Sequence, residues 1–537
     1  MNHNTLQEKL KHRLHVTWNI FFRRFGILTE IQLKSIPIVL QKKNAIITSS
    51  TATGKTEAVI APISELLLEE RWPALSILYI TPTRALVNDI FERLESQLQT
   101  VGIKIEKKTG DSPYVNWSNP PDMLITTPES LDSMICRNKS VLQSIHVIIL
   151  DELHILDGNY RGDQLRILLK RLRQIDPNFT LYILSATLSN PLEVGARYVD
   201  QFELIEAGGS RQIIHTLAGS LEEVFEKTRK EELKKILIFC NSRRRTEETA
   251  IQAKRLWGEN FVVVHHGSLH KHEREESEFI MKTNSRAVCV ATMTLEIGID
   301  IGNIDAVVLV DVPFTISSLI QRIGRAGRRT GIIRIFGICS PDEREIFEVM
   351  IKAARENLLE TKIYHPDYSV CIQQLFSMSY ATPQGILRQS VISLLGTIYS
   401  IDDLEKCIFP HLQDLEWIEV HGDKIYATEK LMNLGAIGKI HSNIPDTHAF
   451  SVKNVLSNRL IGEIELPVTI KPRTCFVLAG KVWEIVKVEK RTIQVKPSKT
   501  GGIPASFKKI QDCGAFFYLL PEIIQERESE IILNGDG

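Results

Sequence analysis

Residues 44–58, NAIITSSTATGKTEA, contain the pattern from which the fold can be deduced. The apolar run NAIIT favours a short buried strand, and the residues after Lys55 have the spacing of a helix. A strand, a loop and a helix in this order direct backbone N–H groups at an anion. The ending Gly54-Lys55-Thr56 is typical of a phosphate-binding loop, although Ser49 replaces its usual first glycine. We therefore expect Lys55 to reach the phosphates of ATP and Thr56 to bind Mg²⁺.

Short apolar runs recur on both sides of this loop. Runs without polar alternation indicate strands that are buried on both faces of a parallel sheet. The first group is NAIITSS, SILYITP, DMLITTP, HVIILDE and LYILSAT; the second is KILIFCN, FVVVHHG, AVCVATM, AVVLVDVP and RIFGICS. We expect two tandem α/β domains, residues 25–206 and 216–362, joined by a linker at 207–215. A basic and aromatic segment, residues 1–24, precedes them.

The pattern changes after about residue 365. Three helical stretches, SVCIQQLFSMSYA, QSVISLLG and IDDLEKCIFPHLQDL, come before WIEVHGDKIYATEK, which favours a hairpin turning at Gly422–Asp423. Three helices and a hairpin indicate a winged-helix domain at residues 363–435. Strand patterns such as RLIGEIEL and KVWEIVKVEK then indicate a β-rich domain at 436–520. We expect the acidic tail, 521–537, to be partly frayed.

The composition is that of a globular protein. Hydrophobic residues make up 43% and charged residues 24% of the 537 residues, and the formal net charge is zero. Zero net charge gives no general sign of a nucleic-acid partner, but a local basic surface suffices for binding. None of the eight cysteines forms a C-x-x-C pair, so a zinc or iron–sulfur site is not expected. The polar N-terminus and the absence of long apolar runs predict a cytoplasmic protein.

Two further stretches complete a hydrolytic site. In VIILDELHIL, residues 147–156, Asp151 would hold Mg²⁺ and Glu152 would orient and deprotonate the attacking water. In QRIGRAGRR, residues 321–329, Arg325 and Arg328 lie on neighbouring helical positions. We expect both arginines to neutralise charge on the γ-phosphate, so that hydrolysis would require the two α/β domains to close.

The order of the motifs TATGKT, TPTRAL, TTPES, DELH, SAT, ATMTLEIGID and QRIGRAGR resembles that of DExH-type helicases of superfamily 2. The segments TGDSPYVNWSNPPDMLITTPESL, VVVHHGSLHKHERE and TLEIGIDIGNIDAVVLVDVP resemble, in particular, the large helicase-related (Lhr) family. The resemblance extends from about residue 20 to 515 and implies two RecA-like domains, a winged helix and a β-rich domain. Such proteins usually continue for several hundred residues more. We therefore expect whatever that additional region contributes to be absent here or supplied by a partner protein.

The resemblance also assigns the remaining nucleotide-site residues. FGILTEIQ is similar to the family's Q motif, in which Phe25 would stack on adenine and Thr29 and Gln32 would complete its recognition. Catalytic roles are implied for His154 and Gln321. The further residues implied to bind ATP are Ser50, Thr51, Ala52, Thr53, Gly54, Gly298 and Asp300. Ser185 and Thr187 are implied to couple ATP hydrolysis to movement.

In this superfamily one nucleic-acid strand lies across both α/β domains, held mainly by its phosphates. The positions implied here are Thr83, Arg84, Thr127, Asn241, Ser242, Arg243, His266, Gly267, Thr292 and Thr294. Threonine and asparagine at strand ends also cap helices, which is the alternative interpretation for each of them. Trp417 and Trp483 are candidates for stacking on a base, or for packing in a core.

The resemblance implies an ATP- and Mg²⁺-dependent translocase that moves 3′→5′ on single-stranded DNA and unwinds duplexes or hybrids. Two alternatives stay open. The chain could be a motor or clamp subunit of a larger DNA-processing or defence assembly that does not unwind alone. It could also act on RNA, because no residue of the sequence decides between the two sugars.

Overall fold

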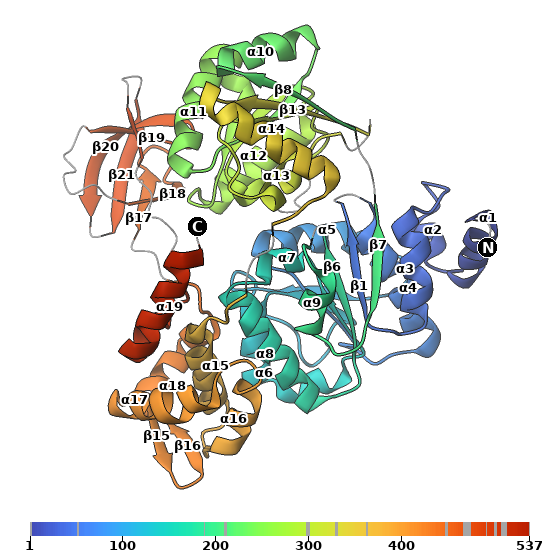
Figure 1. Ribbon diagram of the computed structural model, residues 1–537, viewed down its shortest axis with the longest axis vertical. Coiled ribbons are helices and arrows are strands. Elements are labelled where there is room, and N and C mark those ends of the chain that lie inside the picture. Colours follow the sequence, from blue (N-terminus) through green and yellow to red (C-terminus); the bar gives the residue numbers. More distant parts are fainter. Residues whose placement is uncertain are drawn as a thin grey trace. The chain divides into compact units, whose positions relative to one another are not determined.

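A computed structural model describes the chain except residues 1–2, 51–52, 187, 209–211, 297–300, 328–330, 361–363, 446–448, 466–473, 490, 499–501, 506–512 and 536–537 (Figure 1). None of the helices in these described parts has the length and apolarity needed to cross a membrane.

The first sheet has seven parallel strands and confirms the first α/β domain. Its spatial order is β3 (Ile105–Lys108), β4 (Met123–Thr126), β2 (Ile77–Ile80), β5 (Val147–Leu150), β6 (Thr180–Ser185), β1 (Ala45–Ser49) and β7 (Glu203–Ala207). The helices that accompany it are α1 (His3–Arg13), α2 (Trp18–Phe21), α3 (Glu30–Leu40), α4 (Lys55–Glu70), α5 (Arg84–Gln99), α6 (Pro128–Arg137), α7 (Leu153–Leu156), α8 (Tyr160–Ile175) and α9 (Pro191–Ala196).

Two separate cores explain the uninterrupted apolar runs. Ile47 and Tyr79 face a core with helices α1–α5, whereas Ile46 and Leu78 face a second core with α6, α8 and α9. Neighbouring residues of a strand point to opposite faces, so a strand covered on both sides must be apolar throughout. The edge strands β3 and β7 were not predicted, because their exposed positions carry polar residues such as Glu203.

The second sheet has six parallel strands in the order β10 (Val262–His265), β11 (Ala287–Ala291), β9 (Lys235–Phe239), β12 (Ala306–Leu309), β13 (Ile332–Ile338) and β8 (Gln212–Ala218). Its helices are α10 (Leu221–Lys230), α11 (Arg243–Trp257), α12 (Lys271–Thr283), α13 (Ile316–Ile323) and α14 (Pro341–Glu356). The edge strand β8 was not predicted either, and several of its side chains are exposed.

A helical segment follows the second sheet in the chain. It comprises α15 (Tyr368–Ala381), α16 (Arg388–Leu395), a π-helical turn (Asp403–Ile408), α17 (Phe409–Asp414), α18 (Glu429–Ala436) and a three-stranded sheet of β14 (Ile386–Leu387), β16 (Lys424–Ala427) and β15 (Ile418–His421). The hairpin turn at Gly422–Asp423 is confirmed, since His421 pairs with Lys424. The winged-helix assignment stays a prediction.

The tail forms the helix α19 (Glu522–Gly535), where the sequence indicated a partly frayed segment. Ile524 of this helix is buried in the same core as Trp417 and Val370. Burial of an apolar side chain stabilises a helix whose sequence alone gives little support.

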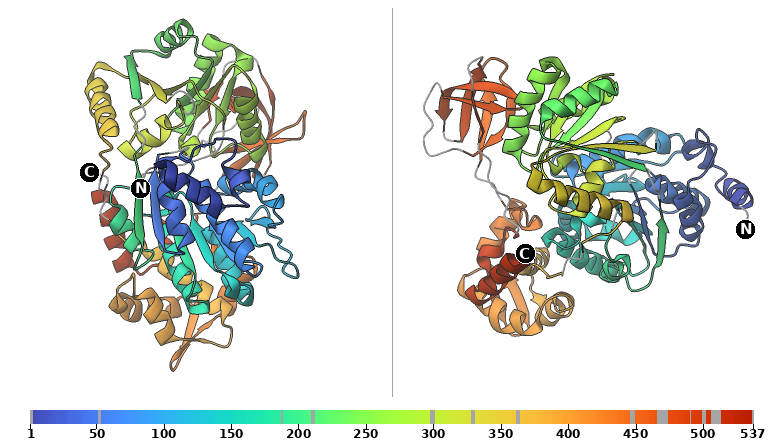
Figure 2. Two further views of the ribbon diagram at one scale, coloured as in Figure 1. Left: turned by 90° about the vertical axis from the view of Figure 1, so that its right-hand side faces the viewer. Right: turned by 45° about the horizontal axis from the view of Figure 1, so that its top comes forward.

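The β-rich segment forms a six-stranded sheet, with strands β18 (Leu460–Ile464), β17 (Phe450–Asn454), β21 (Thr492–Pro497), β20 (Lys481–Glu489), β19 (Cys475–Leu478) and β22 (Ile503–Pro504) in that order. It lies beside α11 of the second α/β domain (Figures 1 and 2). The two share one core, in which Ala253 of α11 and Val264 of β10 pack with Trp483 of β20.

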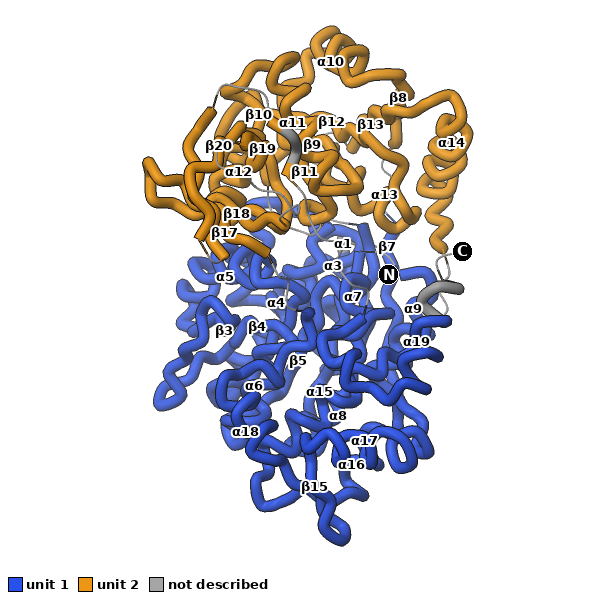
Figure 3. The backbone as a smooth tube through the Cα atoms, turned by 90° about the vertical axis from the view of Figure 1, so that its left-hand side faces the viewer, with its two compact units in different colours: residues 1–208, 361–446, 511–537 blue, residues 209–360, 447–510 orange. Residues whose placement is uncertain are grey.

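The chain divides into two compact units (Figure 3). Unit 1 consists of residues 1–208, 361–446 and 511–537, and unit 2 of residues 209–360 and 447–510. The helical segment therefore belongs with the first α/β domain and the β-rich sheet with the second.

Candidate active site and nucleic-acid interface

The loop after β1 in unit 1 has the conformation of a phosphate-binding loop. Gly54 has φ = 88°, in the left-handed region, and α4 begins at the next residue. This backbone conformation favours glycine, and a β-carbon at Gly54 would also displace the amide of Gln32. Lys55 Nζ donates to the carbonyl oxygens of Ser49 and Ser50, the latter at 3.1 Å. The Ser49 hydroxyl lies 2.6 Å from that of Thr53, which braces the loop from within.

The predicted adenine-recognition residues contact this same loop. Thr29 and Gln32 form a reciprocal cap at the start of α3. The Thr29 hydroxyl also donates to the Thr53 carbonyl at 2.9 Å, and Gln32 Nε2 donates to the Gly54 carbonyl at 3.4 Å. Phe25 is 60% exposed, and the Arg24 guanidinium lies over its ring, 4.4 Å from the ring centre.

The acid pair lies at the end of β5, one strand removed from β1 because β6 lies between them. Asp151 accepts a hydrogen bond from the Tyr79 hydroxyl at 2.6 Å. Burial and the neighbouring Glu152 carboxylate raise the pKa of Asp151 to about 6. Glu152 has φ = 49°, a left-handed conformation that is strained for a residue with a β-carbon and is typical of functional sites.

Two residues of this site were missed by sequence reasoning. Tyr79 donates a hydrogen bond to Asp151, one of the two expected Mg²⁺ ligands. Arg93 Nη2 lies 3.2 Å from the Thr56 hydroxyl. A signal for Tyr79 existed, since it is the one aromatic residue in the buried run SILYITP, and a buried phenol needs a partner.

The predicted coupling residue Ser185 lies next to the acid pair. Its buried hydroxyl is 3.1 Å from Nδ1 of His154, and that nitrogen is 3.5 Å from a carboxylate oxygen of Glu152. The structure therefore brings the ends of β5 and β6 together through His154.

The nucleic-acid positions predicted in unit 1 follow β2 and β4. Parallel strands all end at one edge of the sheet, which places these residues at the same edge as the phosphate loop. Thr83 caps α5, and its hydroxyl accepts from Leu86 N at 3.2 Å. Arg84 is exposed and pairs with Asp111 at 2.5 Å, whereas Thr127 is buried at the start of α6.

In unit 2, the predicted residues again follow the carboxyl ends of parallel strands. Ser242 caps α11 by accepting from Arg245 N at 3.1 Å. The hydroxyl of Thr294 forms a hydrogen bond with His265 Nδ1 at 2.9 Å and lies 3.5 Å from the hydroxyl of Thr292. The other predicted positions at this edge are Asn241, Arg243, His266 and Gly267.

The arginine segment of unit 2 is held by a residue that the sequence did not single out. Arg322 is buried and donates to Glu296 Oε1 at 2.6 Å and to Asn241 Oδ1 at 2.8 Å. Arg325 is also buried, and its Nη2 donates to the Glu296 carbonyl at 2.6 Å. Gln321 is half-buried on the same helix. Glu296 therefore joins the loop after β11 to α13.

The two tryptophans considered for base stacking lie in the described parts of the chain, whereas several predicted site residues do not. Trp417 and Trp483 are buried in the cores of their units, with 8% and 5% of their surface exposed, so the core interpretation is confirmed. The predicted site residues that lie outside the described residues are Thr51, Ala52, Thr187, Gly298, Asp300 and Arg328.

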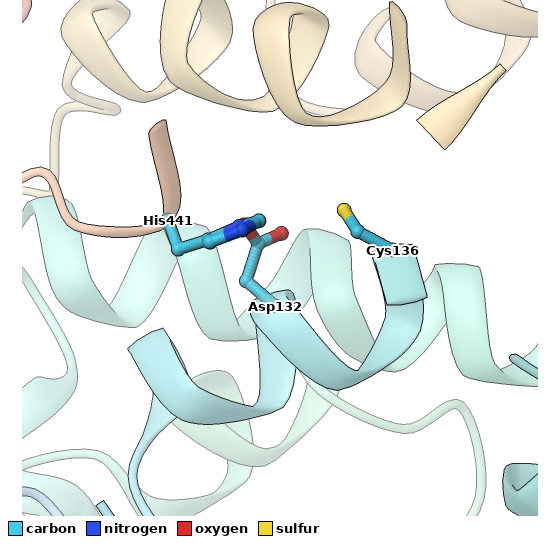
Figure 4. A group of neighbouring side chains, drawn as sticks. All are labelled: Asp132, Cys136 and His441. Carbon is cyan, nitrogen blue, oxygen red and sulfur yellow. The ribbon is translucent and has the colours of Figure 1, made fainter. Parts of the chain in front are cut away.

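A buried polar cluster in unit 1 lies apart from these predicted sites. Figure 4 shows Asp132 and Cys136 of α6 with the imidazole of His441 directed at Asp132, and possible ligand atoms of the three lie within 4.8 Å of one another. Asp132 accepts from Arg171 Nη1 at 2.8 Å and from His441 Nδ1 at 2.7 Å. Ser377 of α15 donates to it at 2.8 Å. Asp132 thus accepts hydrogen bonds from α8, from α15 and from His441, which indicates a structural network between α6, α8 and the helical segment.

Comparison with known proteins agrees with this architecture. The family model described as DEAD/DEAH box helicase matches residues 29–194, and the one described as helicase conserved C-terminal domain matches residues 217–330. Together they cover more than half of the chain, which therefore belongs to the DEAD/DEAH-box helicases of superfamily 2.

Curated relatives narrow the family. ATP-dependent helicase Lhr-Core protein 2 of Thermococcus barophilus is 29% identical over 96% of this chain and 68% of its own length. The Lhr-Core helicase of Methanocaldococcus jannaschii is 30% identical over 91% of this chain and 64% of its own. The chain is similar to the Lhr-Core helicases over nearly its whole length, and it spans about two thirds of the length of these curated relatives.

Solved structures share the fold. Helicase Lhr of Mycobacterium smegmatis, bound to single-stranded DNA and AMP-PNP, matches 80% of this chain and 62% of its own with a TM-score of 0.67 at 24% identity. Helicase MrfA, bound to DNA and AMPPNP, matches 91% of this chain and 72% of its own with a TM-score of 0.73 at 20% identity.

Proposed function

We propose that the protein is a cytoplasmic ATP-dependent translocase that moves 3′→5′ on single-stranded DNA and unwinds duplexes. The observation that carries this proposal is the nucleotide site of unit 1. There the phosphate loop, the adenine-recognition residues Thr29 and Gln32 and the acid pair Asp151–Glu152 gather at one edge of a parallel sheet.

The chain's own residues suit the steps of hydrolysis. Lys55 begins α4 and would exchange its two carbonyl partners for the β- and γ-phosphates, which α4 also attracts through its N-terminus. Glu152 would orient the attacking water and accept its proton, and His154 links Glu152 to Ser185. The roles of Arg325, Arg328 and Gln321 at the γ-phosphate stay predictions.

Thr56 and Asp151 suit Mg²⁺. Both offer hard oxygen ligands, and burial raises the pKa of Asp151, a cost that a bound cation would offset. When bound, Mg²⁺ would neutralise part of the negative charge of the phosphates.

The nucleic-acid strand would cross the carboxyl edges of both sheets. Hydroxyl, amide and guanidinium groups such as those of Thr83, Arg84 and Asn241 suit phosphate contacts that do not depend on sequence. The relatives' names and titles support DNA as the ligand, since the Lhr and MrfA structures contain DNA.

The first test is the variant Lys55→Ala, with Lys43→Ala as its matched control. Lys43 is exposed, precedes β1 and pairs with Glu203 at 3.2 Å, so its loss removes an equal charge outside the site. We expect Lys55→Ala to lose nucleic-acid-stimulated ATP hydrolysis by at least about 100-fold, as for the loss of a main transition-state contact. Retained hydrolysis in Lys55→Ala would refute the assignment.

The substrate needs a separate measurement. We expect single-stranded DNA to stimulate ATP hydrolysis more strongly than RNA of the same sequence, and the reverse order would indicate an RNA helicase. Strand displacement by the purified protein tests unwinding. Stimulated hydrolysis without displacement would favour a motor or clamp that needs a partner.

A further inference from the structure

The β-rich sheet of unit 2 is joined by backbone pairing to the loop that follows β10. This loop, residues 266–270, contains the predicted nucleic-acid contacts His266 and Gly267 and is called the β10 loop below. His270 N donates to the Ile461 carbonyl at 2.8 Å, and Glu463 N donates to the Ser268 carbonyl at 2.7 Å. The β10 loop is thus an added strand segment at the edge of β18.

Gly462 permits this close approach. It lies opposite Leu269 in the pairing, and a β-carbon added to it would clash with the carbonyl oxygen of Ser268. Glycine inside a strand often marks a place where another backbone approaches closely.

A buried carboxylate makes a second connection. Glu247 of α11 accepts from Ala479 N at 2.6 Å and from Gly480 N at 2.7 Å, at the turn between β19 and β20. His266 Nε2 lies 2.9 Å from the same carboxylate. Lys254 of α11 donates to the carbonyl of Gly480. One side chain therefore holds both the β10 loop and the β-rich sheet.

The β10 loop and the β-rich sheet share one hydrophobic core. Leu269 of the β10 loop and Val264 of β10 pack with Ile461, Leu478 and Trp483 of the β-rich sheet. Close-packed interiors move as one body, so the sheet and the loop keep one relative position.

The β-rich segment is also strongly basic in a chain whose charges balance. Residues 447–510 contain twelve Lys and Arg residues and four Glu residues, whereas the whole chain has 65 of each sign. A local excess of this size favours a polyanionic partner.

Two of these cations lie next to the β10 loop. Arg459 and Lys481 are exposed. Arg459 lies two residues before Ile461, whose carbonyl accepts from His270 N at 2.8 Å. Lys481 directly follows Gly480, whose N–H donates to the Glu247 carboxylate that His266 also contacts. The helix α12, whose first turn contains Glu273, begins directly after the β10 loop.

The other acids of α12 already have partners. Glu275 pairs with Lys271 at 3.6 Å, and Glu278 lies 2.9 Å from His265. Glu276 lies 4.0 Å from the imidazole of His272.

We propose that the β-rich sheet extends the nucleic-acid surface of the second α/β domain, with Arg459 and Lys481 as phosphate contacts and Glu247 as the positioning residue that holds His266. The inference rests on the proposed function, because it assigns further contacts to the same strand. Phosphate contacts of this kind add affinity without sequence preference.

The contact residues are tested by Arg459→Ser and Lys481→Ser, with Lys487→Ser as the control. Lys487 is exposed on the same sheet and pairs with Glu489 at 2.5 Å. The dissociation constant for a single-stranded DNA oligonucleotide is measured over a range of salt concentrations. Each lost phosphate contact should weaken binding several-fold and lower the salt-dependence slope by about 0.7, whereas Lys487→Ser should keep the wild-type slope.

The positioning residue is tested by Glu247→Gln, with Glu248→Gln as its neighbour control. Glu248 pairs with Arg244 at 3.0 Å on the outer side of α11. We expect Glu247→Gln to raise the DNA concentration for half-maximal ATPase stimulation at least fivefold, with kcat at saturating DNA unchanged. Glu248→Gln should match the wild type in both quantities, and a change in kcat alone would contradict the positioning role.

The outcomes separate the inference from the proposed function. If the wild-type protein binds no single-stranded nucleic acid, both are overturned. If the wild type and Lys487→Ser bind, and Arg459→Ser and Lys481→Ser bind equally well with the same salt slope, only the inference is overturned.

Discussion

The buried network around Asp132 should make the stability of unit 1 depend on pH through His441. Burial lowers the pKa of His441, but the hydrogen bonds and charges of Asp132 and Cys136 together outweigh burial and raise that pKa to about 9. Burial would raise the pKa of Asp132, yet the hydrogen bond from His441 and the charge of Arg171 hold it below its ordinary value. The folded protein therefore binds a proton on His441 that the unfolded chain releases near pH 6.5.

The magnitude follows from linkage. A folded pKa of about 9 against an unfolded value of about 6.5 corresponds to about 3 kcal/mol of folding free energy, at about 1.4 kcal/mol per unit. Because the folded pKa is the higher one, this contribution is complete below about pH 6.5. It declines as pH rises and is lost above about pH 9.

The assay is thermal or urea unfolding of the full chain between pH 6 and 9.5, for the wild type and His441→Gln. The difference in unfolding free energy between the two should shrink by about 3 kcal/mol across this range, since other titrating groups contribute equally to both. His421→Gln is the control, because His421 is exposed in the same unit and pairs with Glu419 on the surface. Parallel stability profiles of the wild type and His441→Gln would refute the reasoning.

Three further changes test the sites described above. Ser49→Gly removes only the 2.6 Å contact with Thr53, so ATP turnover should stay within about threefold of the wild type; a collapse would reveal a catalytic role for the hydroxyl. Tyr79→Phe removes the donor to buried Asp151 and should lower the unfolding free energy by about 1–3 kcal/mol, measured by urea denaturation; unchanged stability would contradict the bond. Gly462→Ala should cost about 1–3 kcal/mol through overpacking and speed amide exchange in the β10 loop, and unaltered exchange would show that the pairing tolerates a methyl group.

Much of the nucleotide site was predictable from local sequence. Lys55, Thr56, Asp151 and Glu152 each follow an apolar run, and parallel strands bring such residues to one edge of a sheet. The edge strands were missed for the complementary reason. Strands such as β7, which contains Glu203, have an exposed side and lack the continuous apolar run on which the prediction depended.

The partners of the site residues were not predictable, because they come from distant parts of the chain. Tyr79 lies 72 residues from Asp151, and the turn at Ala479 lies 232 residues from Glu247. Each is an ordinary residue in its own stretch and acquires its role only from the group it meets.

By itself, the sequence determined two parallel α/β sheets and the order of the motifs along their carboxyl edges. The physical reason is local: buried strands must be apolar on both faces, and phosphate chemistry needs particular side chains at the strand ends. Only the tertiary structure decided that the helical segment packs with the first sheet and the β-rich segment with the second. Those choices depend on which exposed edges and apolar faces of distant segments fit one another, as β18 fits the β10 loop, and no single stretch of sequence contains that information.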